Sequence, residues 1–206
     1  MITALEIQKS NKNKVNLYID GQYKCALTTE SVVKARLKVG QELPEEQLKE
    51  ILNGSESQIA FDKSLNYISK SMKTVSQVAD YLKNKGFEQS VINQVLDKLK
   101  SYKYVDDDIY TSMYIENAKQ SKGALRIKQE LLLKGVDKQL IETKLSFLDQ
   151  EDSLLSAQKA AQKFIKNKQS DEKFKLKLYR HLLSRGFDYE TVNSVVGFII
   201  ENNNKE

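Results

Sequence analysis

The feature that most constrains the fold is an internal repeat. Three segments of the chain align on Gly86, Gly135 and Gly186, which lie 49 and 51 positions apart. Self-similarity at this period is typical of stacked helical units and has to be recognised before a single large domain is considered. We therefore predict three tandem units of similar structure.

The residues before each glycine follow one pattern. Apolar residues lie eight and four positions before it, on one face of a helix: Val78 and Leu82, Ile127 and Leu131, Leu178 and Leu182. A basic residue directly precedes the glycine, where a cation favours the negative end of a helix and glycine accepts a left-handed backbone. The pattern predicts a helix that ends at Gly86, Gly135 and Gly186.

Each unit is expected to contain two further helices. An acid two positions after the glycine (Glu88, Asp137 or Asp188) suits the start of a second amphipathic helix. Earlier helices are expected near 60–69, 108–119 and 154–164. The predicted units are thus 58–106, 107–150 and 151–202, each with three helices. Because fifty residues bury little surface, we expect the units to stack into an elongated, curved array.

Residues 1–55 are predicted to form a small α+β domain. Alternating apolar positions on both sides of Asp20-Gly21 indicate a β-hairpin, and Ile2 to Ile7 can supply a third strand. Short helices are expected over 28–37 and 44–52. Turn residues at 53–57 then predict a linker at Gly54 to Ser57.

Composition favours a mainly α protein and a reducing compartment. Charged residues make up 30% of the chain, with one Pro, one Cys and no Trp. A single cysteine, Cys25, excludes an internal disulfide, and we find no signal peptide and no apolar run of about 18 residues. We expect a cytoplasmic monomer that does not contact a membrane.

The sequence offers little for catalysis. His181 is the only histidine, and no metal-ligand spacing or phosphate-binding glycine loop occurs. The acids Asp106 to Asp108 could in principle bind Mg²⁺. Since neighbouring residues point in different directions and precede an amphipathic segment, we favour helix capping, by Asp107 above all, and leave a hydrolase as a minor alternative. We expect no enzymatic activity, no cofactor and no metal.

Basic residues are the candidate binding residues, in a chain with a formal net charge of +5. They recur in all three units: Lys70, Lys73 and Lys83; Lys119, Lys122, Arg126 and Lys128; Lys173, Lys177 and Arg180. If aligned, such stripes would attract phosphates or an acidic protein groove, although a merely solvated face is the open alternative. Four tyrosines (Tyr102, Tyr104, Tyr110 and Tyr114) could stack on bases, but we expect most of them to be packing residues.

Several of these motifs resemble RecX proteins. The runs from Tyr67 to Thr74, Lys85 to Phe87 and Tyr104 to Asp107 resemble the first RecX repeat and its exit, and Thr74 with Gln77 forms a capping box. The segment from Lys122 to Val136 is similar to the second repeat, and the third repeat matches more weakly. The N-terminal hairpin resembles an extra domain of RecX proteins from low-GC Gram-positive bacteria. The chain departs from the family where it has Lys70 and Lys73 for arginine and Thr111 for alanine.

The resemblance implies a non-enzymatic regulator. RecX proteins bind in the helical groove of the RecA recombinase filament on single-stranded DNA and restrain its growth, strand exchange and co-protease activity, and so DNA repair and the SOS response. The expected partner is the RecA filament, with single-stranded DNA bound weakly or through the filament. The alternative is a direct DNA-binding protein, because each helix, glycine turn and helix could form a helix-turn-helix.

Overall fold

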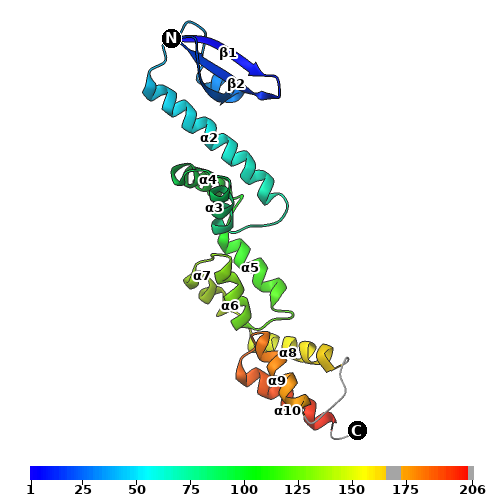
Figure 1. Cartoon of the computed structure of the whole chain (residues 1–206). Helices are drawn as coiled ribbons and strands as arrows, with labels where there is room; N and C mark the ends of the chain where they lie inside the picture. Colours follow the sequence, from blue (N-terminus) through cyan, green and yellow to red (C-terminus); the bar gives the residue numbers. More distant parts are fainter. Residues whose placement is uncertain (166–172, 204–206) are drawn as a thin grey trace. The chain divides into compact units, whose positions relative to one another are not determined.

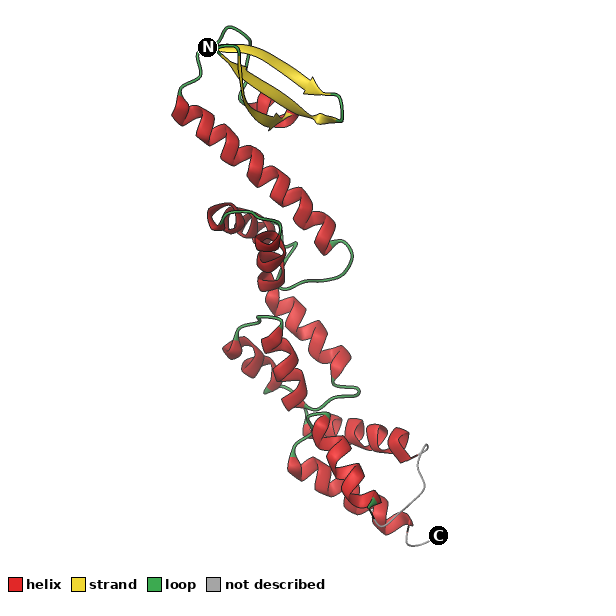
Figure 2. Cartoon of the chain, viewed as in Figure 1, coloured by secondary structure: helices red, strands yellow, loops and turns green. Residues whose placement is uncertain are grey.

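A computed structural model describes residues 1–165 and 173–203 (Figures 1 and 2). Within these residues the chain is mainly helical, with one small sheet. The elements are β1 (Ile2–Gln8), β2 (Asn11–Ile19), β3 (Gln22–Thr28), α1 (Thr29–Lys34), α2 (Glu45–Ile68), α3 (Val75–Asn84), α4 (Gln89–Ser101), α5 (Asp107–Ala118), α6 (Ala124–Leu133), α7 (Lys138–Leu145), α8 (Gln150–Ile165), α9 (Phe174–Ser184) and α10 (Tyr189–Asn203). The predicted class, three-helix repeats after an N-terminal α+β domain, is confirmed.

The N-terminal domain is an antiparallel sheet in the order β1-β2-β3. Its hairpin turns at Asp20 and Gly21, with φ of 49° and 79°, so both residues adopt the positive φ that a tight hairpin turn needs. Ile2 to Ile7 supply the third strand, as expected. The apolar face of the sheet is closed by the segment after α1 and by the start of α2, in a core of Ile2, Leu17, Leu27, Leu37 and Leu48.

The predicted linker is wrong. Helix α2 runs without a break from Glu45 to Ile68, so Gly54 to Ser57 are helical and a domain boundary at residue 55 would fall inside one helix. A glycine in a helix interior costs about 1 kcal/mol relative to alanine, which is why the turn-rich composition was misleading.

Burial on both halves of α2 outweighs that cost. Leu48 joins the core of the N-terminal domain, and Phe61 packs edge-on against Tyr102 at the end of α4. Between them Ser55 is buried, and its Oγ accepts a hydrogen bond from the amide of Thr28 at 3.1 Å. The segment assigned to a linker is therefore part of the packed structure.

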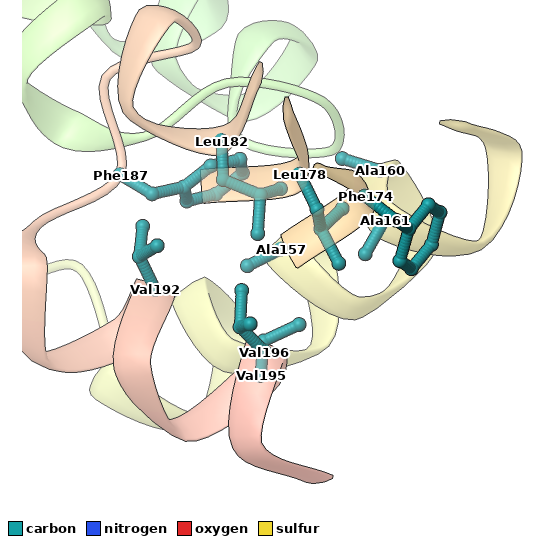
Figure 3. Close-up of a cluster of buried hydrophobic side chains, with 10 residues drawn as sticks. All are labelled: Ala157, Ala160, Ala161, Phe174, Leu178, Leu182, Phe187, Val192, Val195 and Val196. Atoms are coloured by element: carbon teal, nitrogen blue, oxygen red, sulfur yellow. The ribbon is translucent and has the colours of Figure 1, made fainter. Parts of the chain in front are cut away.

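The repeats bury the faces that the pattern predicted. In the third repeat, α8, α9 and α10 enclose a cluster shown in Figure 3: Ala157, Ala160, Ala161, Phe174, Leu178, Leu182, Phe187, Val192, Val195 and Val196. In the second repeat, Ile127, Leu131 and Ile141 are fully buried among α5, α6 and α7. The middle helices α3, α6 and α9 end at Gly86, Gly135 and Gly186, whose φ values lie between 75° and 85°.

By its internal contacts the chain divides into two compact units. The first holds Met1–Ser71 and Val78–Tyr104, and the second holds Met72–Gln77 and the residues from Val105 onwards.

Within the second unit, the start of α6 is seated on the glycine turn that ends α9. The amide of Gly123 donates to the carbonyl of Arg185 at 2.9 Å, and the amide of Leu125 donates to the carbonyl of Gly186 at 3.1 Å. The Arg185 guanidinium returns a bond to the carbonyl of Ser121. Amides that lack a partner inside α6 thus meet carbonyls that lack a partner inside α9, and the helix dipoles attract.

The start of α3 also contacts the end of the next middle helix in this unit, but it does so through side chains. The Thr74 hydroxyl donates to the carbonyl of Lys134 at 2.6 Å, and the amide of Val75 donates to the carboxylate of Asp107 at 2.8 Å. Thr74 and Gln77 also complete the expected capping box. Thr74 and Gly123 each lie twelve positions before a repeat glycine, so the two seatings use equivalent positions.

Gly54→Ala tests the continuity of α2. A Cβ at residue 54 meets nothing within 4 Å, and the position has no positive φ. We expect the free energy of unfolding in urea to rise by about 0.5–1 kcal/mol, because alanine is the better helix former. A flexible linker at 54–57 would instead leave this value unchanged.

Gly123→Ala tests the seating of α6. The added Cβ would lie 2.2 Å from the carbonyl oxygen of Gly186, a backbone atom that cannot move without shifting the turn. We expect a loss of about 1–3 kcal/mol of stability, the usual cost of overpacking. Because Gly54→Ala is the same exchange without a clash, opposite signs for the two variants in one urea series would isolate the contact.

Candidate functional site

The ten candidate basic residues fall into two groups. Six are exposed (Lys70, Lys83, Arg126, Lys173, Lys177 and Arg180), and four are partly buried (Lys73, Lys119, Lys122 and Lys128). Three of the partly buried lysines pair with acids of the second unit: Lys119 with Glu116 and Asp152, Lys122 with Glu130, and Lys128 with Glu142. Among the described residues, Lys70, Lys83 and Arg180 have no ion pair. The ten residues predicted to bind a partner are therefore divided into exposed cations and cations that pair within the chain.

Lys122 and Arg126 belong to a polar cluster around Glu130. The Glu130 carboxylate accepts from Lys122 Nζ at 2.6 Å, Arg126 Nε at 2.9 Å and the Tyr114 hydroxyl at 2.5 Å. Only 17% of the Glu130 side chain is exposed. The cluster ties α5, the turn before α6, and α6 together. A change at Lys122 or Arg126 would therefore alter the second repeat itself as well as any partner contact.

The cluster shifts the pKa of two of its members. Burial alone would raise the pKa of Glu130, but the hydrogen bonds from Lys122, Tyr114 and Arg126 outweigh it and lower that pKa to about 2. Burial, followed by the bond to Glu130, raises the pKa of the Tyr114 hydroxyl. Both shifts stabilise the same state, an ionised carboxylate that accepts a hydrogen bond from a neutral phenol.

The acids Asp106, Asp107 and Asp108 serve three different elements. Asp106, and not Asp107, caps α5 by accepting from the amides of residues 108 and 109. Asp107 instead accepts from the first amide of α3, and Asp108 pairs with Lys144 of α7 at 2.7 Å. No group of three His, Cys, Asp or Glu side chains in the described part of the chain is placed to hold a metal ion.

An exposed apolar pattern is repeated on the middle helices of the second unit. Leucines lie ten and three positions before the glycine in both α6 and α9: Leu125 and Leu132, and Leu176 and Leu183. All four, which we call the leucine stripe, are exposed, between 42% and 56%. The same places in α3 hold Ser76 and Lys83. Equivalent positions and similar exposure in two repeats make these leucines a candidate contact surface.

Because the start of α6 rests on the end of α9, the backbones of Leu125 and Gly186 are in contact, and the α9 half of the leucine stripe ends three residues before Gly186. Leu125 lies in the first turn of α6, and its amide donates to Gly186, three residues beyond Leu183. The exposed Arg180 lies between Leu176 and Leu183 along α9. Sequence reasoning missed this surface because it searched for charge. A position-by-position comparison of the aligned repeats would have found these leucines. It would not have shown that they are exposed.

The side chains of His181 and Cys25 have surroundings that suit a structural role. The His181 ring lies 4.5 Å from the Phe164 ring and accepts a hydrogen bond from Arg185 Nε. Burial raises the pKa of the Cys25 thiol, which opposes its ionisation. None of the described helices has the length and apolar character needed to cross a bilayer.

Family models match in four consecutive stretches. The "Regulatory protein RecX N-terminal domain" matches residues 1–44, and the first, second and third three-helix domains of RecX match 60–99, 106–145 and 150–196. The chain belongs to the RecX family. Proteins named "Regulatory protein RecX" are similar over nearly the whole chain.

Two clostridial proteins illustrate this similarity. The Clostridium beijerinckii protein is 37% identical over 199 residues, covering 95% of this chain and 93% of its own. The Clostridium perfringens SM101 protein is 36% identical, covering 98% and 97%. A crystal structure of regulatory protein RecX is 27% identical, with a TM-score of 0.71, and covers 94% of this chain and 97% of its own.

The departure from the usual RecX sequence at Thr111 has a structural basis. Thr111 is fully buried in α5, where a small residue is required, and its hydroxyl donates to the carbonyl of Asp107 at 2.6 Å. The hydroxyl is therefore satisfied within its own helix. Lys70 is exposed, so an exchange with arginine there alters no packing inside the chain.

The Glu130 cluster predicts a pH dependence of stability. Because the folded-state pKa of Glu130 lies below its usual value of 4.5, its contribution is fully present above that value and is lost as the pH falls towards 2. We expect Glu130→Gln to be less stable than the natural chain at pH 7 and the difference to shrink between pH 4.5 and 2. Urea unfolding over this range measures it. A difference that stays constant with pH would show that the carboxylate charge contributes nothing.

Proposed function

We propose that this RecX-family chain modulates the RecA recombinase filament on single-stranded DNA by binding along it. Membership of a family of regulatory proteins supports a regulatory role. The leucine stripe supports a protein partner. It presents apolar side chains, with Arg180 between them, whereas a surface for bare phosphates needs cations above all.

The leucine stripe is the observation that carries the proposal. Four half-exposed leucines are an unfavourable surface in water, and covering them would release the free energy of burying apolar area. A filament offers the same surface many times, so a chain that repeats its own contact can engage successive protomers. Arg180, which has no ion pair in the described residues, adds attraction to acidic protein surface.

The helix-turn-helix alternative is disfavoured by the helices that would have to enter a groove. In this reading α4, α7 and α10 are the recognition helices, and the lysines of α4, Lys98 and Lys100, lie only in its last turn. Helix α10 contains two glutamates and no lysine or arginine, and Lys144 of α7 is paired with Asp108. The proposal therefore includes no independent reading of duplex sequence. We also propose that the chain acts as a cytoplasmic monomer and catalyses no reaction.

Inhibition of RecA by a leucine-stripe variant tests the proposal. We expect Leu176→Ser with Leu183→Ser to require about tenfold more protein for half-maximal reduction of ATP hydrolysis by filaments preformed on single-stranded DNA. The matched control is Leu155→Ser, an exposed leucine of α8 in the same repeat, which should act like the natural chain.

The outcomes separate the surface from the function. A folded double variant that inhibits as well as the natural chain would remove the leucine stripe from the contact. A natural chain that changes neither ATP hydrolysis nor filament length would contradict the proposed function itself.

A further inference from the structure

Two tyrosines at the end of α4 remain exposed. Tyr102 is 57% and Tyr104 is 55% exposed, and their ring centroids lie 5.7 Å apart. Of the other two tyrosines considered for base stacking, Tyr110 is buried and Tyr114 is bonded to Glu130. The structure thus leaves one adjacent pair able to take a flat ligand on its faces. Within the described residues, neither hydroxyl of this pair has a hydrogen-bond partner.

The backbone between these rings is held in an unusual conformation. The amide of Tyr104 donates to the carbonyl of Leu99, and the amide of Lys103 donates to that of Lys100, which together form a Schellman end to α4. Lys103 takes the left-handed position with a φ of 56°. The other three helix ends of this type in the repeats use glycine there. A lysine in this conformation is strained, and it lies between the two tyrosines in sequence.

The residue after the left-handed position also differs from its counterparts. At the ends of α6 and α9 this residue is Val136 or Phe187, and both are buried in the core of their repeat. At the end of α4 it is Tyr104, which stays exposed although its backbone bonds are the same. Packing therefore does not account for the aromatic ring at this position.

Lysines lie within and just before the pair, while Asp97 precedes this segment and Asp106 to Asp108 follow it. Residues 98–104 contain Lys98, Lys100 and Lys103 and no acid. Lys98 Nζ lies 4.1 Å from the centroid of the Phe61 ring, and the Phe61 and Tyr102 rings pack edge to face with their centroids 6.3 Å apart. For Lys100 and Lys103 no ion pair occurs among the residues that the structure describes. Exposed aromatic faces among unpaired cations are the usual recognition surface for unpaired bases and their phosphates.

We propose that residues 98–104, here called the tyrosine platform, bind single-stranded DNA. The rings of Tyr102 and Tyr104 stack on unpaired bases, and the lysines contact the adjoining phosphates. The bases of a duplex are already stacked on one another, so duplex DNA offers no faces to the rings. The inference rests on the proposed function, to which it adds a direct contact with the DNA that the recombinase filament carries.

Binding of a thymidine oligonucleotide without recombinase tests the tyrosine platform. We expect Tyr102→Ala with Tyr104→Ala to weaken binding, measured by fluorescence anisotropy, by at least about tenfold. The matched control is Tyr23→Ala with Tyr189→Ala, two tyrosines that are at least as exposed but lie outside the platform. Because the chain has no tryptophan, its emission comes from its ten tyrosines, and the quenching that the platform double variant loses reports stacking at the platform.

Two further variants separate stacking from structural effects. Tyr102→Phe with Tyr104→Phe should keep the affinity within about twofold, since rings of the same size remain, while most of the quenching disappears. Lys103→Gly should raise the urea midpoint, because glycine relieves the left-handed strain, and yet weaken binding. A purely structural role for Lys103 predicts that a more stable variant binds equally well.

Two results would contradict DNA binding by the tyrosine platform. Equal affinity for a duplex of the same length, or an alanine double variant that binds like the natural chain, would overturn the tyrosine platform. Since no recombinase is present in this assay, either result leaves the leucine-stripe measurement on filaments unaffected. A protein that inhibits filaments but binds no oligonucleotide would retain the proposed function and lose this inference.

Discussion

The second unit depends on one contact, the seating of a helix start on the glycine turn of the following repeat. Unpaired amides of α6 meet unpaired carbonyls at the end of α9, so each terminus satisfies the other. The contact is close enough that a Cβ at Gly123 or Gly186 would overlap backbone atoms. Glycine thus has two roles in these repeats, since it permits the left-handed turn and it leaves room for the neighbouring helix.

The sequence predicted those parts of the fold that depend on local pattern. Helices, glycine ends, the capping box and the hairpin follow from spacing that a single segment contains. The continuity of α2 did not, because it depends on burial of Leu48 and Phe61 in separate clusters, which outweighs the low helix propensity of Gly54. The cap of α5 was likewise assigned to Asp107 above all, but Asp106 provides it, and Asp107 accepts from an amide 32 positions away.

The candidate site also differs from the prediction, because it depends on contacts between distant residues. Charge is visible in a sequence, but pairing is not, and Lys122 and Arg126 are held by Glu130 through contacts that fold the second repeat. The surface that a partner could contact includes exposed leucines, which the composition did not indicate. Leucines that look like ordinary core residues lie on the surface at equivalent places of two repeats. A regulator built in this way would gain affinity from buried area and would use unpaired cations to steer association.

The seating contact is also open-ended. Helix α6 has both halves of this contact, because its start rests on the turn that ends α9 and its own end accepts the hydroxyl of Thr74. A tandem duplication of about fifty residues would inherit both halves of the joint without a new interface having to evolve. The chemistry of the joint therefore imposes no limit on the number of repeats in such a chain.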